Sequence, residues 1–235
     1  MNKKIFQDGF TLAEVLITLG IIGVVAAMTL PTLIGKYQMK SFEVAFKKQY
    51  AVLQDTFNYL NLEEGLTKCY VYLVPQNGDI PSHYAFEYSE CSTLQEELVN
   101  KLNLQEIEYF HKYAKQSDVL TNGGAMVNGS VTHDFSSPVK AYLSKDGAIY
   151  ILGPNQGGNM IDRNRSSYIV LDVNGSKKPN KWGYDVFWLT IVLKNNKIML
   201  TDELASLIEK GGRFPRDILR NQNNDPNKPV TFYWK

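Results

Sequence analysis

Glu14 is the residue whose position in this sequence points most directly to chemistry. It comes directly before twenty consecutive positions without a charge, residues 15–34. In a helix these would span roughly 30 Å, the thickness of a bilayer core. A carboxylate near the centre of a membrane helix costs about 2.5–3.5 kcal/mol, and less near its end. Such a residue is retained by default for a function, and we therefore expect Glu14 to have a charged partner.

Two ordinary explanations of this N-terminus give Glu14 no role. A secretory signal peptide has an apolar region of about 7–15 residues. The run here is longer, and Glu14 would lie inside the apolar region of such a signal peptide. A plain membrane anchor fits the length, but Glu14 would then only extend toward the interface. Lys3 and Lys4 favour a cytoplasmic N-terminus, although lysines also follow the span: Lys36, Lys40, Lys47 and Lys48.

The stretch 9–14, GFTLAE, followed by the apolar run, resembles the N-terminus of type IV pilins and type II secretion pseudopilins. A short basic leader ends in Gly9, Phe10 follows, and Glu14 is the fifth residue after the glycine. Pro31 also falls where pilins carry a helix-disturbing proline. The resemblance implies that a prepilin peptidase cuts between Gly9 and Phe10 and methylates the new amino terminus. It also implies that Glu14 pairs with the Phe10 ammonium of a neighbouring subunit during filament assembly.

The spacing of apolar residues predicts the helix that carries these groups. Between residues 42 and 60, steps of three or four predict one face of an amphipathic helix: Phe42, Phe46, Tyr50, Leu53, Phe57 and Leu60. We expect one helix from Phe10 to about Glu64, roughly 80 Å long, with a kink or local melting at Pro31. After the leader, residues 1–9, it divides into a transmembrane half, 10–34, and an amphipathic half, 35–64. Barely three heptads argue against a coiled coil.

Residues 65–235 predict a globular α+β head with an antiparallel sheet laid across the long helix, which is also the architecture that the pilin resemblance implies. A helix is expected from Cys91, with Thr93 and Glu96 as its capping box. A strand or an extended loop is expected at 66–74, and strands are expected at 141–143, 148–151, 167–171, 187–193 and 197–200. Hairpin turns are expected at 146–147 and 195–196. A surface loop is expected at 121–137, a short helix between 201 and 212, and an irregular tail after it.

The two cysteines, Cys69 and Cys91, both lie in the predicted head. If the N-terminus is cytoplasmic, the head is outside, where thiols oxidise. We therefore expect a disulfide, which would enclose 21 residues and contribute about 3 kcal/mol through loop entropy. The alternative is two separate buried thiols.

The densest group of oxygen ligands lies between residues 172 and 185. Asp172 and Asn174 are spaced as at the start of calcium loops, and Asp185 could complete a Ca²⁺ site. The resemblance adds weight, since some major pseudopilins bind calcium in a C-terminal loop. No glutamate follows at calcium-loop spacing, and three lysines oppose a cation: Lys177, Lys178 and Lys181. The alternative is a turn-rich connection whose side chains cap their own backbone.

Nothing in the sequence predicts an enzyme or a nucleic-acid partner. His83, His111 and His133 are scattered without metal-ligand spacing. No nucleophile signature or phosphate loop accompanies the cysteines or the glycine pairs. The net charge of +1 offers no broad electrostatic surface for nucleic acid. Loss of the leader would leave 23 basic and 23 acidic residues.

The resemblance to pilins and pseudopilins implies a structural subunit of a type IV pilus or a type II secretion pseudopilus. Its expected partners are the prepilin peptidase, other pilin or pseudopilin subunits and an inner-membrane assembly platform. We expect a single-pass protein of the cytoplasmic membrane, with its head outside, that then enters a filament. The alternative is a membrane-tethered extracytoplasmic binding domain that does not polymerise.

Overall fold

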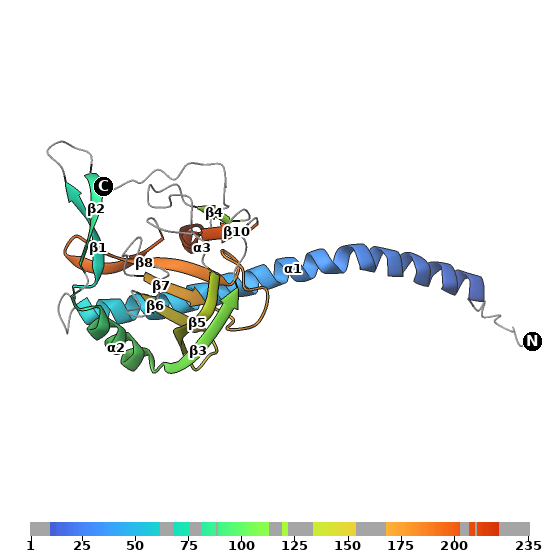
Figure 1. Cartoon of the computed structure of the whole chain (residues 1–235). Coiled ribbons are helices and arrows are strands. Elements are labelled where there is room, and N and C mark those ends of the chain that lie inside the picture. Colours follow the sequence, from blue (N-terminus) through green and yellow to red (C-terminus); the bar gives the residue numbers. More distant parts are fainter. Residues whose placement is uncertain are drawn as a thin grey trace, which may run out of the picture. The chain divides into compact units, whose positions relative to one another are not determined.

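A computed structural model describes most of the chain, in the ranges 10–61, 68–75, 81–87, 89–112, 119–121, 134–153, 168–202, 207–209 and 211–220. The chain divides into two compact units, Met1–Ser41 and Phe42–Lys235. The predicted leader, with Gly9, lies outside the described residues. The first unit contains the beginning of the helix α1, and the second contains the remainder of α1 and the sheet (Figure 1).

Helix α1 runs from Leu12 to Tyr59 without interruption, with Pro31 inside it. We predicted a kink or local melting at Pro31. The helix is not melted there, and the kink stays a prediction. Proline removes one backbone donor from the helix, and the hydrogen bonds on either side of Pro31 are sufficient to continue it. The predicted end near Glu64 lies outside the described residues.

The second part of α1 has the amphipathic character that its spacing predicts. Phe46, Leu53, Phe57 and Leu60 are at most 3% exposed and belong to one hydrophobic cluster with residues of the sheet and of helix α2. The helix lies along one face of the sheet because this stripe needs an apolar surface to cover it.

The sheet has eight strands, in the order β2-β1-β8-β7-β6-β5-β3, and β9 also pairs with β8 (Figure 1). Pairing is antiparallel except between β1 and β8, which meet in parallel at Val71 and Val192. The strand bounds are β1 Tyr70–Pro75, β2 Pro81–Glu87, β3 Gln105–Lys112, β5 Asp134–Leu143, β6 Ile149–Gly153, β7 Tyr168–Asp172, β8 Val186–Lys194 and β9 Lys197–Thr201. The predicted α+β class is confirmed.

The central strands β6 and β7 are buried along their whole length. Their side chains alternate between two clusters, as the pleat requires. In β7, Ile169 and Leu171 join the cluster that contains α1, whereas Tyr168 and Val170 join a second cluster with Trp182 and Trp188. Burial on both faces explains why these strands are continuous apolar runs in the sequence.

Both predicted hairpins are confirmed. The turn between β5 and β6 contains Gly147 with a φ of 88°, and the turn between β8 and β9 contains Asn195 and Asn196 with φ values of 51° and 57°. These left-handed conformations suit glycine and asparagine, and they match the twist of a tight hairpin.

Four predictions for the head are wrong in part. Helix α2, Cys91–Leu102, begins two residues before Thr93, and its N-cap is Glu90 without a side-chain cap, so no capping box forms there. The ends of the predicted loop 121–137 belong to the strands β4, Val119–Thr121, and β5. Residues 207–209 form β10, Leu207–Glu209, which pairs with β4, where a helix was predicted. The predicted tail begins instead with helix α3, Pro215–Arg220, whose fixed proline φ suits a first helical position.

Polar contacts tie the second part of α1 to the sheet. Gln49 donates to Asp146 at 2.6 Å and accepts a hydrogen bond from the Tyr150 hydroxyl, while Lys48 pairs with Asp146 at 2.8 Å. Partial burial raises the pKa of Asp146. Hydrogen bonds from Lys48, Ser144 and Gln49, together with the Lys48 charge, lower it by more, so that the pKa falls to about 2. The β5–β6 turn is thereby joined to the helix by a charged group.

Candidate functional site

The amino end of α1 carries a reciprocal capping arrangement. The Thr11 hydroxyl accepts a hydrogen bond from the Glu14 backbone N–H at 3.2 Å, and the Glu14 carboxylate accepts one from the Thr11 backbone N–H at 2.8 Å. The Thr11 hydroxyl also donates to the same carboxylate oxygen, Oε2, at 2.8 Å. This is a capping box, with Thr11 at the N-cap and Glu14 three residues further on, and it satisfies backbone donors that a helix start leaves open.

The carboxylate keeps one oxygen for another donor. Both Thr11 contacts use Oε2, and Oε1 accepts no hydrogen bond from the residues that the structure describes. Phe10, which precedes the capping pair, is 89% exposed. The site therefore presents an anionic oxygen beside the residue that would become the new amino terminus.

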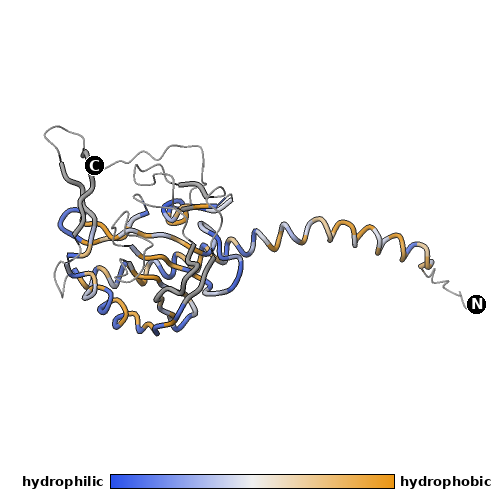
Figure 2. Tube along the Cα trace, viewed as in Figure 1, coloured by the Kyte–Doolittle hydropathy of each residue, from blue (hydrophilic) through white to orange (hydrophobic). Residues whose placement is uncertain are grey.

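The helix that follows is apolar on all sides and nothing in its own unit covers it. Leu16, Ile17, Ile21 and Ile22 are each more than 60% exposed, and the hydrophobic colour runs around this part of α1 (Figure 2). By length and composition α1 is the one helix among the described residues that could cross a membrane. Exposed apolar surface on this scale requires lipid or other protein to bury it.

Two hydroxyl groups within this apolar segment are satisfied locally. Thr18 donates to the Val15 carbonyl at 3.0 Å, and Thr29 donates to the Val25 carbonyl at 2.9 Å. Such bonds to the preceding turn remove the cost of a bare hydroxyl in hydrocarbon. Glu14 is thus the one charged residue in the described segment 10–35.

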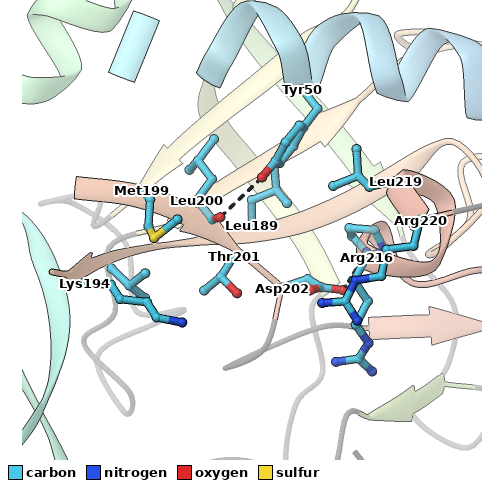
Figure 3. A pocket seen from close by; sticks show the side chains of 12 residues that line it. Tyr50, Leu189, Lys194, Met199, Leu200, Thr201, Asp202, Arg216, Leu219 and Arg220 are labelled. Carbon is cyan, nitrogen blue, oxygen red and sulfur yellow. Dashed lines mark hydrogen bonds between the residues drawn. The ribbon is translucent and has the colours of Figure 1, made fainter. Parts of the chain in front are cut away.

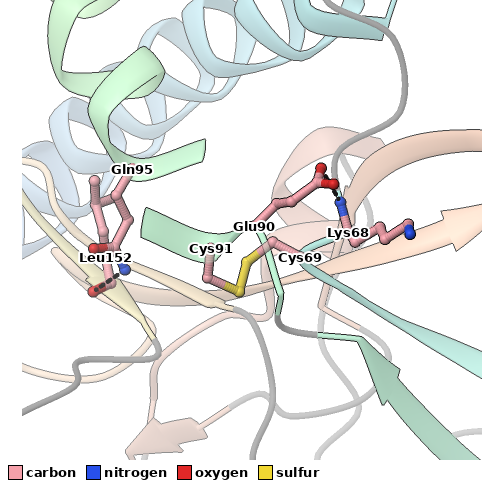
Figure 4. The surroundings of a disulfide bond; sticks show 6 residues. All are labelled: Lys68, Cys69, Glu90, Cys91, Gln95 and Leu152. Carbon is pink, nitrogen blue, oxygen red and sulfur yellow. Dashed lines mark hydrogen bonds between the residues drawn. A yellow bond between two sulfur atoms is a disulfide. The ribbon is translucent and has the colours of Figure 1, made fainter. Parts of the chain in front are cut away.

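The predicted disulfide is present in the head. Cys69 and Cys91 are bonded, with their Cα atoms 4.7 Å apart, and both are nearly buried (Figure 4). The same junction has two further links, since the Glu90 carboxylate accepts from the Lys68 backbone at 2.9 Å and the Glu90 N–H donates to the Lys68 carbonyl at 3.3 Å. The start of β1 is therefore fastened to the start of α2.

The residues predicted to bind calcium serve the loop itself. The Asp185 carboxylate is fully buried and accepts from the backbone N–H groups of Asn180 and Lys181 at 2.8 and 2.7 Å. Asp172 accepts from the backbone of Asn174 at 3.2 Å. Burial raises the pKa of Asp185, although these backbone hydrogen bonds act in the opposite direction. These bonds match the alternative to a calcium site, a turn-rich connection whose side chains cap their own backbone. Among the described residues, no group of three or more His, Cys, Asp or Glu side chains could hold a metal ion. The calcium site stays a prediction.

Sequence reasoning missed one member of the N-terminal site, Thr11. The signal was present, because Thr11 and Glu14 have the T-x-x-E spacing of a capping box directly before an apolar run. We assigned that spacing to Thr93 and Glu96 instead. Glu14 therefore has a local structural role in addition to any role between subunits.

A family model describing the prokaryotic N-terminal methylation motif matches residues 6–30. No curated protein matches the chain, and no solved structure matches it. The matched segment contains the predicted cleavage position, the capping pair and most of the exposed apolar helix. The chain thus carries the prepilin-type N-terminal signal that is the hallmark of type IV pilins and pseudopilins.

Proposed function

We propose that this protein is a structural subunit of a type IV pilus or of a type II secretion pseudopilus, made as a precursor and assembled through α1. The observation that carries the proposal is an uncovered apolar helix that begins with a carboxylate inside a matched methylation motif. In this proposal the head contributes to assembly only by holding the second half of α1.

The proposed processing step creates the cation that Glu14 needs. A prepilin peptidase would cut between Gly9 and Phe10, and the new amine of Phe10, once methylated, would remain a charged ammonium. Within a bundle of apolar helices, an unpaired carboxylate and an unpaired ammonium are each costly, so pairing them fixes the axial register between subunits. The Oε1 oxygen of Glu14 would accept this ammonium while Oε2 keeps the helix capped.

The partners follow from this mechanism. They are the prepilin peptidase, further pilin or pseudopilin subunits and an inner-membrane assembly platform. The precursor would reside in the cytoplasmic membrane with its head outside, and the mature subunit would be moved from the bilayer into the filament. The disulfide in the head fits an oxidising compartment.

The first experiment is intact-mass analysis and N-terminal sequencing of the protein isolated from its own cells. We expect the loss of nine residues and the gain of one methyl group on Phe10. An intact Met1, or cleavage after Ala27, would instead favour the alternative function, a membrane-tethered binding domain that does not polymerise.

The second experiment separates the capping role of Glu14 from its pairing role. Glu14→Gln keeps a side-chain acceptor for the Thr11 N–H but removes the charge, whereas Thr11→Ala removes the cap and keeps the charge. We expect Glu14→Gln and Glu14→Val to insert in the membrane and fail to enter filaments, and Thr11→Ala to be incorporated. Normal incorporation of Glu14→Gln would show that the carboxylate acts only as a helix cap.

A further inference from the structure

A pocket in the second unit lies between α1, the β8–β9 hairpin and α3 (Figure 3). Tyr50 of α1 closes one side and donates a hydrogen bond to the Leu200 carbonyl at 3.4 Å. Apolar side chains also line the pocket, among them Leu189, Val192 and Leu219. No residue of this pocket takes part in the N-terminal site.

The polar wall of the pocket is mainly cationic. It contains Lys194, Arg216 and Arg220 against one carboxylate, Asp202. Arg216 and Arg220 are four residues apart on α3, so they lie on the same face of that helix. Asp202 is 4% exposed, and its carboxylate accepts a hydrogen bond from the backbone N–H of Arg216, at the start of α3, at 3.0 Å. Asp217 of α3 also interacts electrostatically with Arg216 and Arg220, so the three cations outnumber the two nearby carboxylates by one.

The size of the pocket limits what it can hold. Its volume is about 200 Å³, which is below the range of roughly 300–1,000 Å³ usual for sites of drug-sized ligands. A cavity of roughly 150 Å³ holds one benzene molecule. A pocket of this volume can hold one or two side chains, and the cations of its wall favour acidic ones.

The described head carries matching acidic side chains at the opposite end of its sheet. Glu106 and Glu108 are exposed on β3, the strand that ends the sheet order. Being two residues apart in a strand, they point to the same side. Three strands separate β3 from β8, which places them about 19 Å apart at the usual strand spacing. The acidic pair therefore cannot fill the pocket of its own chain.

We propose that this pocket is a subunit contact in which Lys194, Arg216 and Arg220 receive Glu106 and Glu108 of a second copy of the chain. The two surfaces differ, so the contact is head-to-tail. A contact of this kind forms a ring if its rotation closes and an open helical assembly if it does not, and the proposed filament corresponds to the second case. The inference rests on the proposed function, because it names a contact between heads that supplements the helix bundle. The same glutamates would also discourage direct pairing of the β3 edge, and the experiment must distinguish the two roles.

The test uses the full chain in the membranes of its own cells. A photoreactive benzoylphenylalanine replaces Leu219, which is 37% exposed at the rim of the pocket. Irradiation should give a dimer whose cross-linked peptide contains residues 105–108. We expect Arg220→Glu and Glu108→Lys each to lower the dimer yield about tenfold, and the two together to restore it to within about twofold of the original.

Lys145→Glu is the matched control, because Lys145 is an exposed lysine in the β5–β6 turn outside the pocket, and it should leave the yield unchanged. The formation of the Cys69–Cys91 bond on a non-reducing gel reports folding of each variant. If a charge reversal prevents folding, Arg220→Gln and Glu108→Gln replace it, and each should still reduce the yield.

A cross-link to another protein or to lipid, the absence of a dimer, or the absence of rescue in the double variant would overturn the inference. Loss of the leader is measured in the same samples. A processed subunit without the cross-link refutes this contact alone, whereas an unprocessed chain refutes the proposed function.

Discussion

The two parts of α1 share one continuous helix but bury their apolar residues in opposite ways. In residues 12–41 no side chain is buried, and apolar residues occur on every side. In residues 42–59 the buried positions, such as Phe46 and Leu53, form one stripe. A stripe can be covered by one sheet of the same chain, whereas an all-round apolar surface needs a surrounding medium or several partners. The distribution of side chains around the axis, more than helix formation itself, separates the membrane segment from the head.

Polar groups show the same contrast. In the first part they bond within one turn, as Thr11 does with Glu14 and Thr18 does with Val15. In the second part they reach distant segments, since Gln49 donates to Asp146 and Tyr50 donates to the carbonyl of Leu200, which is 150 residues further along the chain. Local bonds leave the first part independent of any tertiary structure, and long-range bonds make the second part inseparable from the sheet.

The largest expected difference comes from truncating one large side chain in each part. Phe46 is fully buried, and its ring centroid lies 4.3 Å from that of Phe187, so Phe46→Ala should lower the free energy of unfolding of the head by about 3–5 kcal/mol. Ile22 is 61% exposed, so Ile22→Ala should change it by less than about 0.5 kcal/mol. Denaturant titration of the detergent-solubilised chain can be followed through the fluorescence of Trp182 and Trp188, which are both buried.

Equal effects of these two substitutions would contradict the comparison. They would mean that residues 12–41 are also part of the cooperative unit that unfolds with the sheet.

Removal of the disulfide should have the next largest effect, and only in the head. The bond joins residues 22 positions apart, so Cys69→Ser combined with Cys91→Ser should lower the free energy of unfolding by about 3 kcal/mol. The helical signal of residues 12–41 should persist, as measured by hydrogen exchange in detergent. An unchanged unfolding midpoint in the double variant, relative to the oxidised parent, would show that the Lys68–Glu90 hydrogen bonds suffice at this junction.

The smallest expected effect concerns the charged link between α1 and the β5–β6 turn. The pKa of Asp146 is lowered to about 2 in the folded protein, so its contribution is present above about pH 4 and is lost as the pH falls through 2. The Asp146 side chain is 37% exposed, and solvent screening should keep the contribution below about 1 kcal/mol. Asp146→Asn should therefore destabilise the head slightly at pH 6 and not at pH 2, as measured by thermal unfolding.

Asp55→Asn provides the matched control for this pH series, since Asp55 is an exposed carboxylate on the same helix. Its difference from the parent should not vary with pH. If the Asp146→Asn difference also stayed constant from pH 6 to pH 2, the charged link would have no role in stability.

Local signals predicted the elements that depend on local physics. The hairpin turns at Gly147 and at Asn195-Asn196 formed where residues that tolerate positive φ interrupt apolar runs. A short helix was predicted between 201 and 212, but residues 207–209 form a strand, because the start and stop signals are equally compatible with a short strand. Pairing of β10 with β4 decided its conformation, and β4 is more than 80 residues away in the sequence. Such a contact leaves no periodicity to detect.

The sequence by itself determined the N-terminal site, because a run of apolar residues, a T-x-x-E start and one carboxylate act within a few turns of one helix. Only the tertiary structure decided which strands adjoin and that Lys194, Arg216 and Arg220 line one pocket. These groups come from segments that meet through the packing of the sheet, and the free energy that brings them together comes from apolar burial elsewhere in the head.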